Sequence, residues 1–93
     1  MGFEWPQWAL DALRGIEPLE VVQALVAKRR LPRPARSAGG VDVLTVWART
    51  RAGRPLVVAV RRTDPWTWLV IGAREMYLQE RTEFARWEEA QDG

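Results

Sequence analysis

Chemistry in this sequence must rest on arginines, carboxylates and a single tyrosine, because the chain contains no cysteine and no histidine. The absence of histidine removes the commonest acid–base catalyst and metal ligand. The absence of cysteine excludes disulfides and thiolate zinc sites. All but one of the 14 basic residues are arginine, whose planar guanidinium binds phosphates and carboxylates through two nitrogens. The sequence therefore has no metal-binding constellation, and its arginines suit an anionic partner.

Four candidate catalytic residues gather near the carboxyl end, where the pattern predicts one helix over residues 73–90. Arg74 and Arg81 fall on one flank of that helix, and Arg74 lies near its amino end, where free N–H groups favour an anion. Both arginines could therefore face one phosphate. In the alternative interpretation, each arginine pairs with a carboxylate on a neighbouring element.

The other two candidates are Glu80 and Tyr77. Glu80 falls within the apolar stripe of the predicted helix, so it needs a partner such as an arginine from the sheet, unless it serves as a general base. Tyr77 is expected in the core with its hydroxyl at the edge, and it is the only phenol that could act as an acid.

Two groups of basic residues could bind a polyanion. The first falls in one short stretch, which is otherwise a solvated loop: Lys28, Arg29, Arg30 and Arg33. The second ends predicted strands beside the helical candidates: Arg49, Arg61 and Arg62. Trp47, Trp66 and Trp68 could stack on bases, although aromatic residues on adjacent strands more commonly pack together.

These side chains are positioned by two predicted amino-terminal helices and three predicted strands. Residues 7–14 and 18–28 are predicted helices, the first ending at Gly15 and the second beginning at Pro18. The apolar face expected for the second helix is Leu19, Val22, Leu25 and Val26.

The strands are predicted at residues 41–49, 55–62 and 66–72, which are rich in β-branched and aromatic side chains. The turns between them are short, so these neighbours must be antiparallel. Residues 3–5 could add a short edge strand, and residues 29–40, rich in arginine, proline and glycine, are predicted to be a mobile loop.

The fold class predicted from this pattern is a single α+β domain over residues 1–93. Its antiparallel sheet would have three to four strands, with two amino-terminal helices and one carboxyl-terminal helix. No segment has the roughly 20 apolar residues that a membrane span requires, and none resembles a signal peptide. We therefore expect a cytoplasmic protein.

The order of several short motifs resembles that of BrnT-type toxins. The opening Phe3-Glu4-Trp5, the Leu13-Arg14-Gly15-Ile16 turn and the following Pro18-Leu19-Glu20-Val21-Val22 resemble the start of that family. Near the end, Val70-Ile71-Gly72-Ala73-Arg74, then Glu80-Arg81 and Phe84, resemble its Ile-Ile-Ser-Ala-Arg and Glu-Arg-x-x-Tyr motifs. The resemblance covers nearly the whole chain.

The resemblance implies a RelE-like fold and a ribonuclease that arrests translation without a cofactor. It also implies a ribbon-helix-helix antitoxin, BrnA-like, in a higher-order complex with the toxin. In such a site, arginines would stabilise the charge that develops on the phosphate during RNA cleavage. Arg14, Gly72 and Phe84 replace the family's histidine, serine and closing tyrosine. Arg14 and Phe84 favour the alternative of a RelE-like partner-binding or autoregulatory module without catalysis. The retained Arg74, Glu80 and Arg81 favour the ribonuclease.

Overall fold

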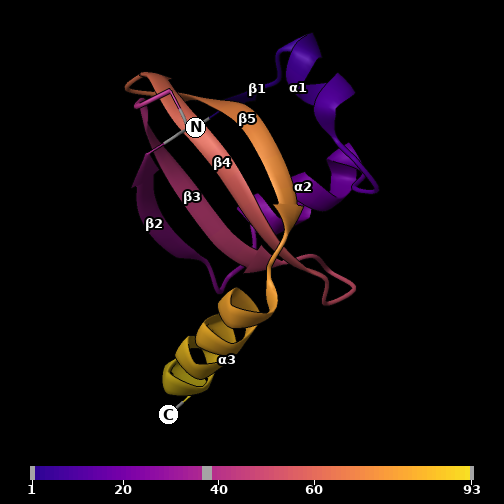
Figure 1. Ribbon diagram of the computed structural model, residues 1–93, viewed down its shortest axis with the longest axis vertical. Helices are drawn as coiled ribbons and strands as arrows, with labels where there is room; N and C mark the ends of the chain where they lie inside the picture. Colours follow the sequence, from indigo (N-terminus) through magenta and orange to yellow (C-terminus); the bar gives the residue numbers. More distant parts are fainter. Residues whose placement is uncertain (1, 37–38, 93) are drawn as a thin grey trace.

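The computed structural model describes residues 2–36 and 39–92, and it is an α+β fold with a five-stranded mixed sheet (Figure 1). The strands lie in the order β1-β5-β4-β3-β2. Two helices precede most of the sheet and one follows it, as predicted. The elements in chain order are β1 Gly2–Glu4, α1 Gln7–Ala12, α2 Pro18–Leu25, β2 Leu31–Arg36, β3 Asp42–Arg49, β4 Pro55–Asp64, β5 Thr67–Glu75 and α3 Leu78–Asp92.

The predicted three-stranded antiparallel meander is confirmed as β3, β4 and β5. Gly53 has φ +95° in the turn between β3 and β4, a conformation that glycine adopts without steric cost. In the same turn, the buried Thr50 hydroxyl accepts a hydrogen bond from the backbone N–H of Arg54 at 3.0 Å. This turn aligns the strands so that each presents one face to α1 and α2 and the other to α3.

Two further strands extend this meander. The predicted edge strand is β1, and it pairs with β5 in the parallel direction. The prediction of a loop over residues 29–40 is wrong for Leu31–Arg36, which form β2 antiparallel to β3. Prolines suggest a loop, but an edge strand tolerates them because half of its N–H groups have no partner in the sheet. Residues 37 and 38 of the predicted loop lie outside the described residues.

The last helix begins later than predicted. β5 continues through Arg74 to Glu75, because Leu56 and Val57 at the start of β4 supply backbone partners for these residues. The backbone N–H of Met76 then donates to the carbonyl of Pro55 at 3.0 Å. Tertiary pairing here outweighs the helical propensity of the local sequence. Arg74 is therefore a strand residue, and it does not lie at the amino end of a helix.

Apolar side chains fill both faces of the sheet. Under α1 and α2, the larger cluster includes Val21, Leu56, Val58, Val60 and Val70. Beside α3, the smaller cluster is Trp47, Val57, Met76 and Phe84, with Leu31 and Trp87 at its margin. Figure 1 shows α3 continuing from the end of β5, so this helix covers only one end of its face.

Both amino-terminal helices are shorter than predicted, ending at Ala12 and Leu25. The predicted apolar face of α2 is correct for Leu25 and wrong for its other three members. The residues that pack on the sheet are Val21, Ala24 and Leu25, whereas Leu19, Val22 and Val26 are exposed. Two apolar stripes therefore run along α2, and the sequence pattern alone does not distinguish the buried one.

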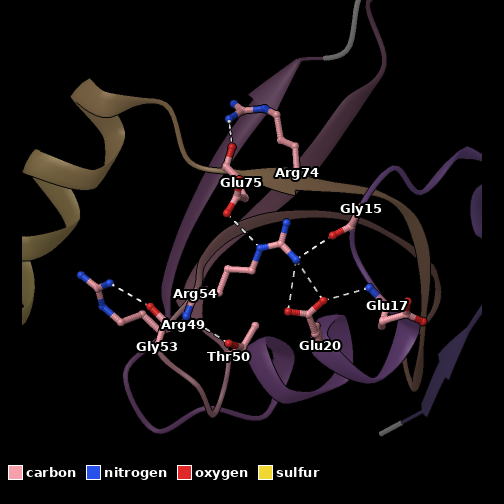
Figure 2. Close-up of polar contacts among 9 residues, drawn as sticks. All are labelled: Gly15, Glu17, Glu20, Arg49, Thr50, Gly53, Arg54, Arg74 and Glu75. Atoms are coloured by element: carbon pink, nitrogen blue, oxygen red, sulfur yellow. Dashed lines mark hydrogen bonds and ion pairs between the residues drawn. The ribbon is translucent and has the colours of Figure 1, made fainter.

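Arg54 joins three separate parts of the chain through its guanidinium (Figure 2). Nε donates to Glu75 of β5 at 2.9 Å. Nη1 donates to the carbonyl of Gly15 at 2.7 Å and to Glu20 of α2 at 3.0 Å. Glu20 also accepts the backbone N–H of Glu17, which closes the first turn of α2. No pattern in the sequence indicates this role for Arg54.

Replacing Arg54 with alanine is expected to lower the midpoint of urea unfolding, because the Gly15 carbonyl and two carboxylates lose a shared donor. Arg14→Ala is the matched control, since Arg14 donates only to nearby backbone carbonyls on the surface. An Arg54→Ala midpoint equal to that of Arg14→Ala would show that the network contributes nothing to stability.

Candidate functional site

Three arginines on the α3 side of the sheet each bind a glutamate of α3. The pairs join three different strands to successive positions along the helix. They are Arg74 with Glu80, Arg33 with Glu83, and Arg49 with Glu88. The helix is therefore held on this face by charge as well as by the apolar contacts of Phe84.

The Arg74–Glu80 pair has the closest geometry of the candidate catalytic residues. The two terminal nitrogens of Arg74 donate to the two oxygens of Glu80 at 2.6 and 2.9 Å. The guanidinium also lies 4.0 Å from the centre of the Tyr77 ring. Hydrogen bonds from Arg74 lower the pKa of Glu80, and the same contact raises the pKa of Arg74. The expectation that Glu80 requires an arginine from the sheet is confirmed.

Glu80 has a second role at the start of α3. Its carboxylate accepts the backbone N–H of Tyr77 at 2.7 Å, so it closes the first turn of the helix. Tyr77 is not in the core as predicted. Its side chain is 65% exposed, because the residue precedes the helix instead of lying on its apolar face. Its phenol is thus accessible to a ligand, whereas Glu80 has a lowered pKa and is a weak base.

Arg81 does not lie beside Arg74 as predicted, because the two residues belong to different elements. Arg81 is exposed on α3, and its side chain forms no ion pair with any residue that the structure describes. The predicted pair of arginines on one helical flank is therefore wrong.

A row of small side chains crosses the sheet next to the part covered by α3. Thr45, Ala59 and Gly72 are direct neighbours on β3, β4 and β5. They are half-buried, and a Cβ added at Gly72 would meet no atom within 4 Å. We call these three residues the small-residue row. The alternation of side chains along each strand predicts which face these residues occupy. Their position side by side could be predicted only if the register between the strands were also known.

Three arginines surround the small-residue row. Arg33 is the next residue across the sheet, opposite Thr45 on β2. Arg61 and Arg74 lie two positions along from Ala59 and Gly72, so they project from the same face. Arg61 is exposed and has no ion pair among the described residues. A narrow floor of small side chains with cations at its margin suits an extended polyanion.

The other predicted RNA-binding residues do not all share this face. Arg49 does, but its guanidinium is held by Glu88 at 2.9–3.0 Å. Arg62 is on the opposite face, stacked over Trp68 at 5.5 Å. The remaining members of the basic stretch do not belong to the strands that form the small-residue row. They lie exposed between α2 and β2: Lys28, Arg29 and Arg30.

Only one of the three tryptophans considered for base stacking is freely accessible. Trp47 is buried beside α3, with the Arg33 guanidinium 4.9 Å from its ring centre. Trp68 packs against the larger apolar cluster. Trp66, in the turn between β4 and β5, is 76% exposed. Trp66 and Trp68 therefore do not pack together within the fold.

Comparison of the chain with models of known protein families and with curated proteins finds no match. In the described part of the chain, no helix is long and apolar enough to cross a membrane. Residues 2–36 and 39–92 also contain no acidic cluster able to hold a metal ion. What the fold and the site define is an α+β protein with arginines around an uncovered strip of sheet.

The Arg74–Glu80 pair is expected to make stability depend on pH in the acidic range. Because the pKa of Glu80 is lowered in the folded state, its contribution is present above the ordinary value of 4.5 and is lost as pH falls below it. Glu80→Gln keeps the cap and removes the charge. We expect it to cost about 1 kcal/mol or less at pH 7, since solvent screens the pair, and the cost should shrink toward pH 3. Urea unfolding of both proteins at several pH values tests this, and a pH-independent difference would contradict it.

Proposed function

We propose that this protein is a BrnT-like toxin with a RelE-like fold that cleaves RNA in the cytoplasm and is neutralised by a ribbon-helix-helix antitoxin. The observation that carries the proposal is the small-residue row with Arg33, Arg61 and Arg74 around it. An RNA strand laid along this row would bring its phosphates to the arginines. The resemblance of the β5–α3 segment to the toxin motifs supports the same location.

In the proposed reaction the 2′-oxygen of the RNA attacks the adjacent phosphorus and the 5′-oxygen leaves. Arg74 stabilises the charge that builds on the phosphate oxygens, and Arg61 binds a neighbouring phosphate of the RNA. Tyr77, exposed and beside Arg74, is the phenol that can give the leaving oxygen a proton. The proton of the 2′-hydroxyl passes to water, since the carboxylate of Glu80 is engaged by Arg74 and by the Tyr77 backbone. Glu80 is thus a positioning residue.

The experiment compares two substitutions at one residue that leave every charge in place. Gly72→Trp should cover the small-residue row, and Gly72→Ala is the matched control, because a Cβ there meets open space. On induction from a tight promoter, we expect wild type and Gly72→Ala to arrest growth and degrade RNA. Gly72→Trp, checked for folding by circular dichroism, should lose at least tenfold in RNA affinity, as about 1.4 kcal/mol of lost contact implies. Equal RNA loss from all three proteins would exclude this face as the site.

A second candidate is a partner-binding module without catalysis. Two observations favour it. Arg74 and Glu80 already hydrogen-bond to each other, and α2 with its C-cap residue exposes the apolar side chains of Leu19, Val22 and Val26. Such a protein would neither arrest growth nor degrade RNA when expressed in folded form. An antitoxin-like partner would still co-purify with it. The same induction experiment therefore separates the two candidates.

A further inference from the structure

A hollow of about 290 Å³ lies on the sheet face that carries α1 and α2, opposite the arginine-rimmed row. Its floor includes Leu44 of β3 and Val60 of β4, and its walls include Phe3 of β1 and Trp68 of β5. α2 ends at Leu25, which also lines the hollow, so the helix leaves this part of the face uncovered. The lining is therefore almost wholly apolar and reaches the surface.

One arginine lines this hollow, and a second stacks on Trp68 in its wall. Arg30 lines it directly, and its Nη1–H donates to the carbonyl of Leu25 at 2.7 Å, which holds the guanidinium at the carboxyl end of α2. Arg62 stacks on Trp68 with 5.5 Å between the guanidinium carbon and the ring centre. Among the described residues neither arginine has a carboxylate partner. Positive charge beside an apolar hollow is thus left without a counter-ion from the fold.

We propose that this hollow binds a small amphipathic carboxylate, a fatty or arylalkanoic acid whose apolar body fills the hollow and whose carboxylate meets Arg30. The volume is at the lower end for small-molecule sites, which limits the ligand to roughly ten non-hydrogen atoms. The remaining nitrogens of Arg30 can grip the carboxylate in a two-point contact. This inference is independent of the proposed RNA-directed function, because it concerns the other face of the sheet.

The experiment titrates the full chain with octanoate and, in parallel, with octan-1-ol, which has a similar apolar body and no charge. Binding is followed by the chemical shifts of the tryptophan indole N–H groups, with Trp68 assigned from a Trp68→Phe spectrum. We expect octanoate to move the Trp68 signal with a Kd between about 30 μM and 3 mM, as a ligand of this size allows. Octanol should bind at least fivefold more weakly.

Two variants make the test specific. Arg30→Gln should raise the Kd for octanoate about fivefold to tenfold and leave that for octanol unchanged, whereas Arg61→Gln, on the other face, should change neither. Leu44→Trp, checked for folding, should abolish binding of both by filling the hollow. Failure of octanoate to move the Trp68 signal would overturn the proposal. Equal affinity for octanoate and octanol would also overturn it, because the site would then not select a carboxylate. The wild-type comparison decides this even if Leu44→Trp does not fold.

Discussion

Replacing Phe84 with alanine is expected to lower the free energy of unfolding by about 3–5 kcal/mol, the usual cost of removing a buried aromatic ring. Phe84 is 0% exposed and is the largest fully buried side chain. It packs with Trp47, Val57 and Met76, and its ring stacks on Trp87 with 5.4 Å between centres. A domain of this size has a total stability of only about 5–15 kcal/mol, so this one substitution would remove much of it.

Leu78→Ala provides the control on the same helix, because Leu78 is 71% exposed. It should change the free energy of unfolding by less than about 0.5 kcal/mol. Urea unfolding followed by tryptophan fluorescence measures both variants. A Phe84→Ala protein as stable as Leu78→Ala would mean that α3 is held by its three ion pairs and not by its apolar contact.

Arg74→Ala is expected to reduce the rate of RNA cleavage about 10²-fold, if the protein is the ribonuclease proposed here. That factor is typical for losing one preorganised group that stabilises developing charge. Arg74 is suited to this task because Glu80 and the Tyr77 ring hold its guanidinium in one orientation. Arg74→Lys should recover little of the rate, since a lysine cannot reproduce the two-point contact. Cleavage of a labelled RNA by purified protein measures the effect.

Three further variants help to define the role of Arg74. Arg14→Ala removes an arginine that contacts only nearby backbone and should leave the rate unchanged. Arg61→Ala should weaken binding more than it slows cleavage at saturating RNA, because Arg61 is exposed and unpaired among the described residues. Glu80→Gln tests the positioning role. If Arg74→Ala cleaves as fast as the wild type while remaining folded, Arg74 is only a structural link between β5 and α3.

The central part of the fold could be predicted from the sequence because its signals are local. The segments that form β3, β4 and β5 are rich in β-branched and apolar residues. The turns between them are short, so the sequence predicts that consecutive strands pair and that they are antiparallel. The α+β class and the order of the three helices could be predicted for the same reason.

The errors arose where contacts distant in sequence decided the structure. Ala73, Arg74 and Glu75 have a helical local sequence, yet pairing with the start of β4 keeps them extended. This shift of a few residues moved Arg74 from helix to strand and exposed Tyr77. The predicted site differs most from the structure, because its geometry depends on where β5 ends and α3 begins. The need of Glu80 for an arginine could still be predicted, because an unpaired carboxylate on a packing face is costly.

The prolines of β2 determine what the outer edge of the sheet can do. Pro32 and Pro34 face Val46 and Leu44 of β3, and since proline cannot donate, these must be the pairs whose backbone groups point away from β3. At Pro32 and Pro34 this edge therefore offers carbonyl oxygens as acceptors but no N–H donors, which an added strand would also need. A strand from a second molecule finds too few hydrogen bonds to add itself there, so this edge resists aggregation and domain swapping. A protein partner that approaches this side of the sheet must therefore recognise side chains instead of prolonging β2.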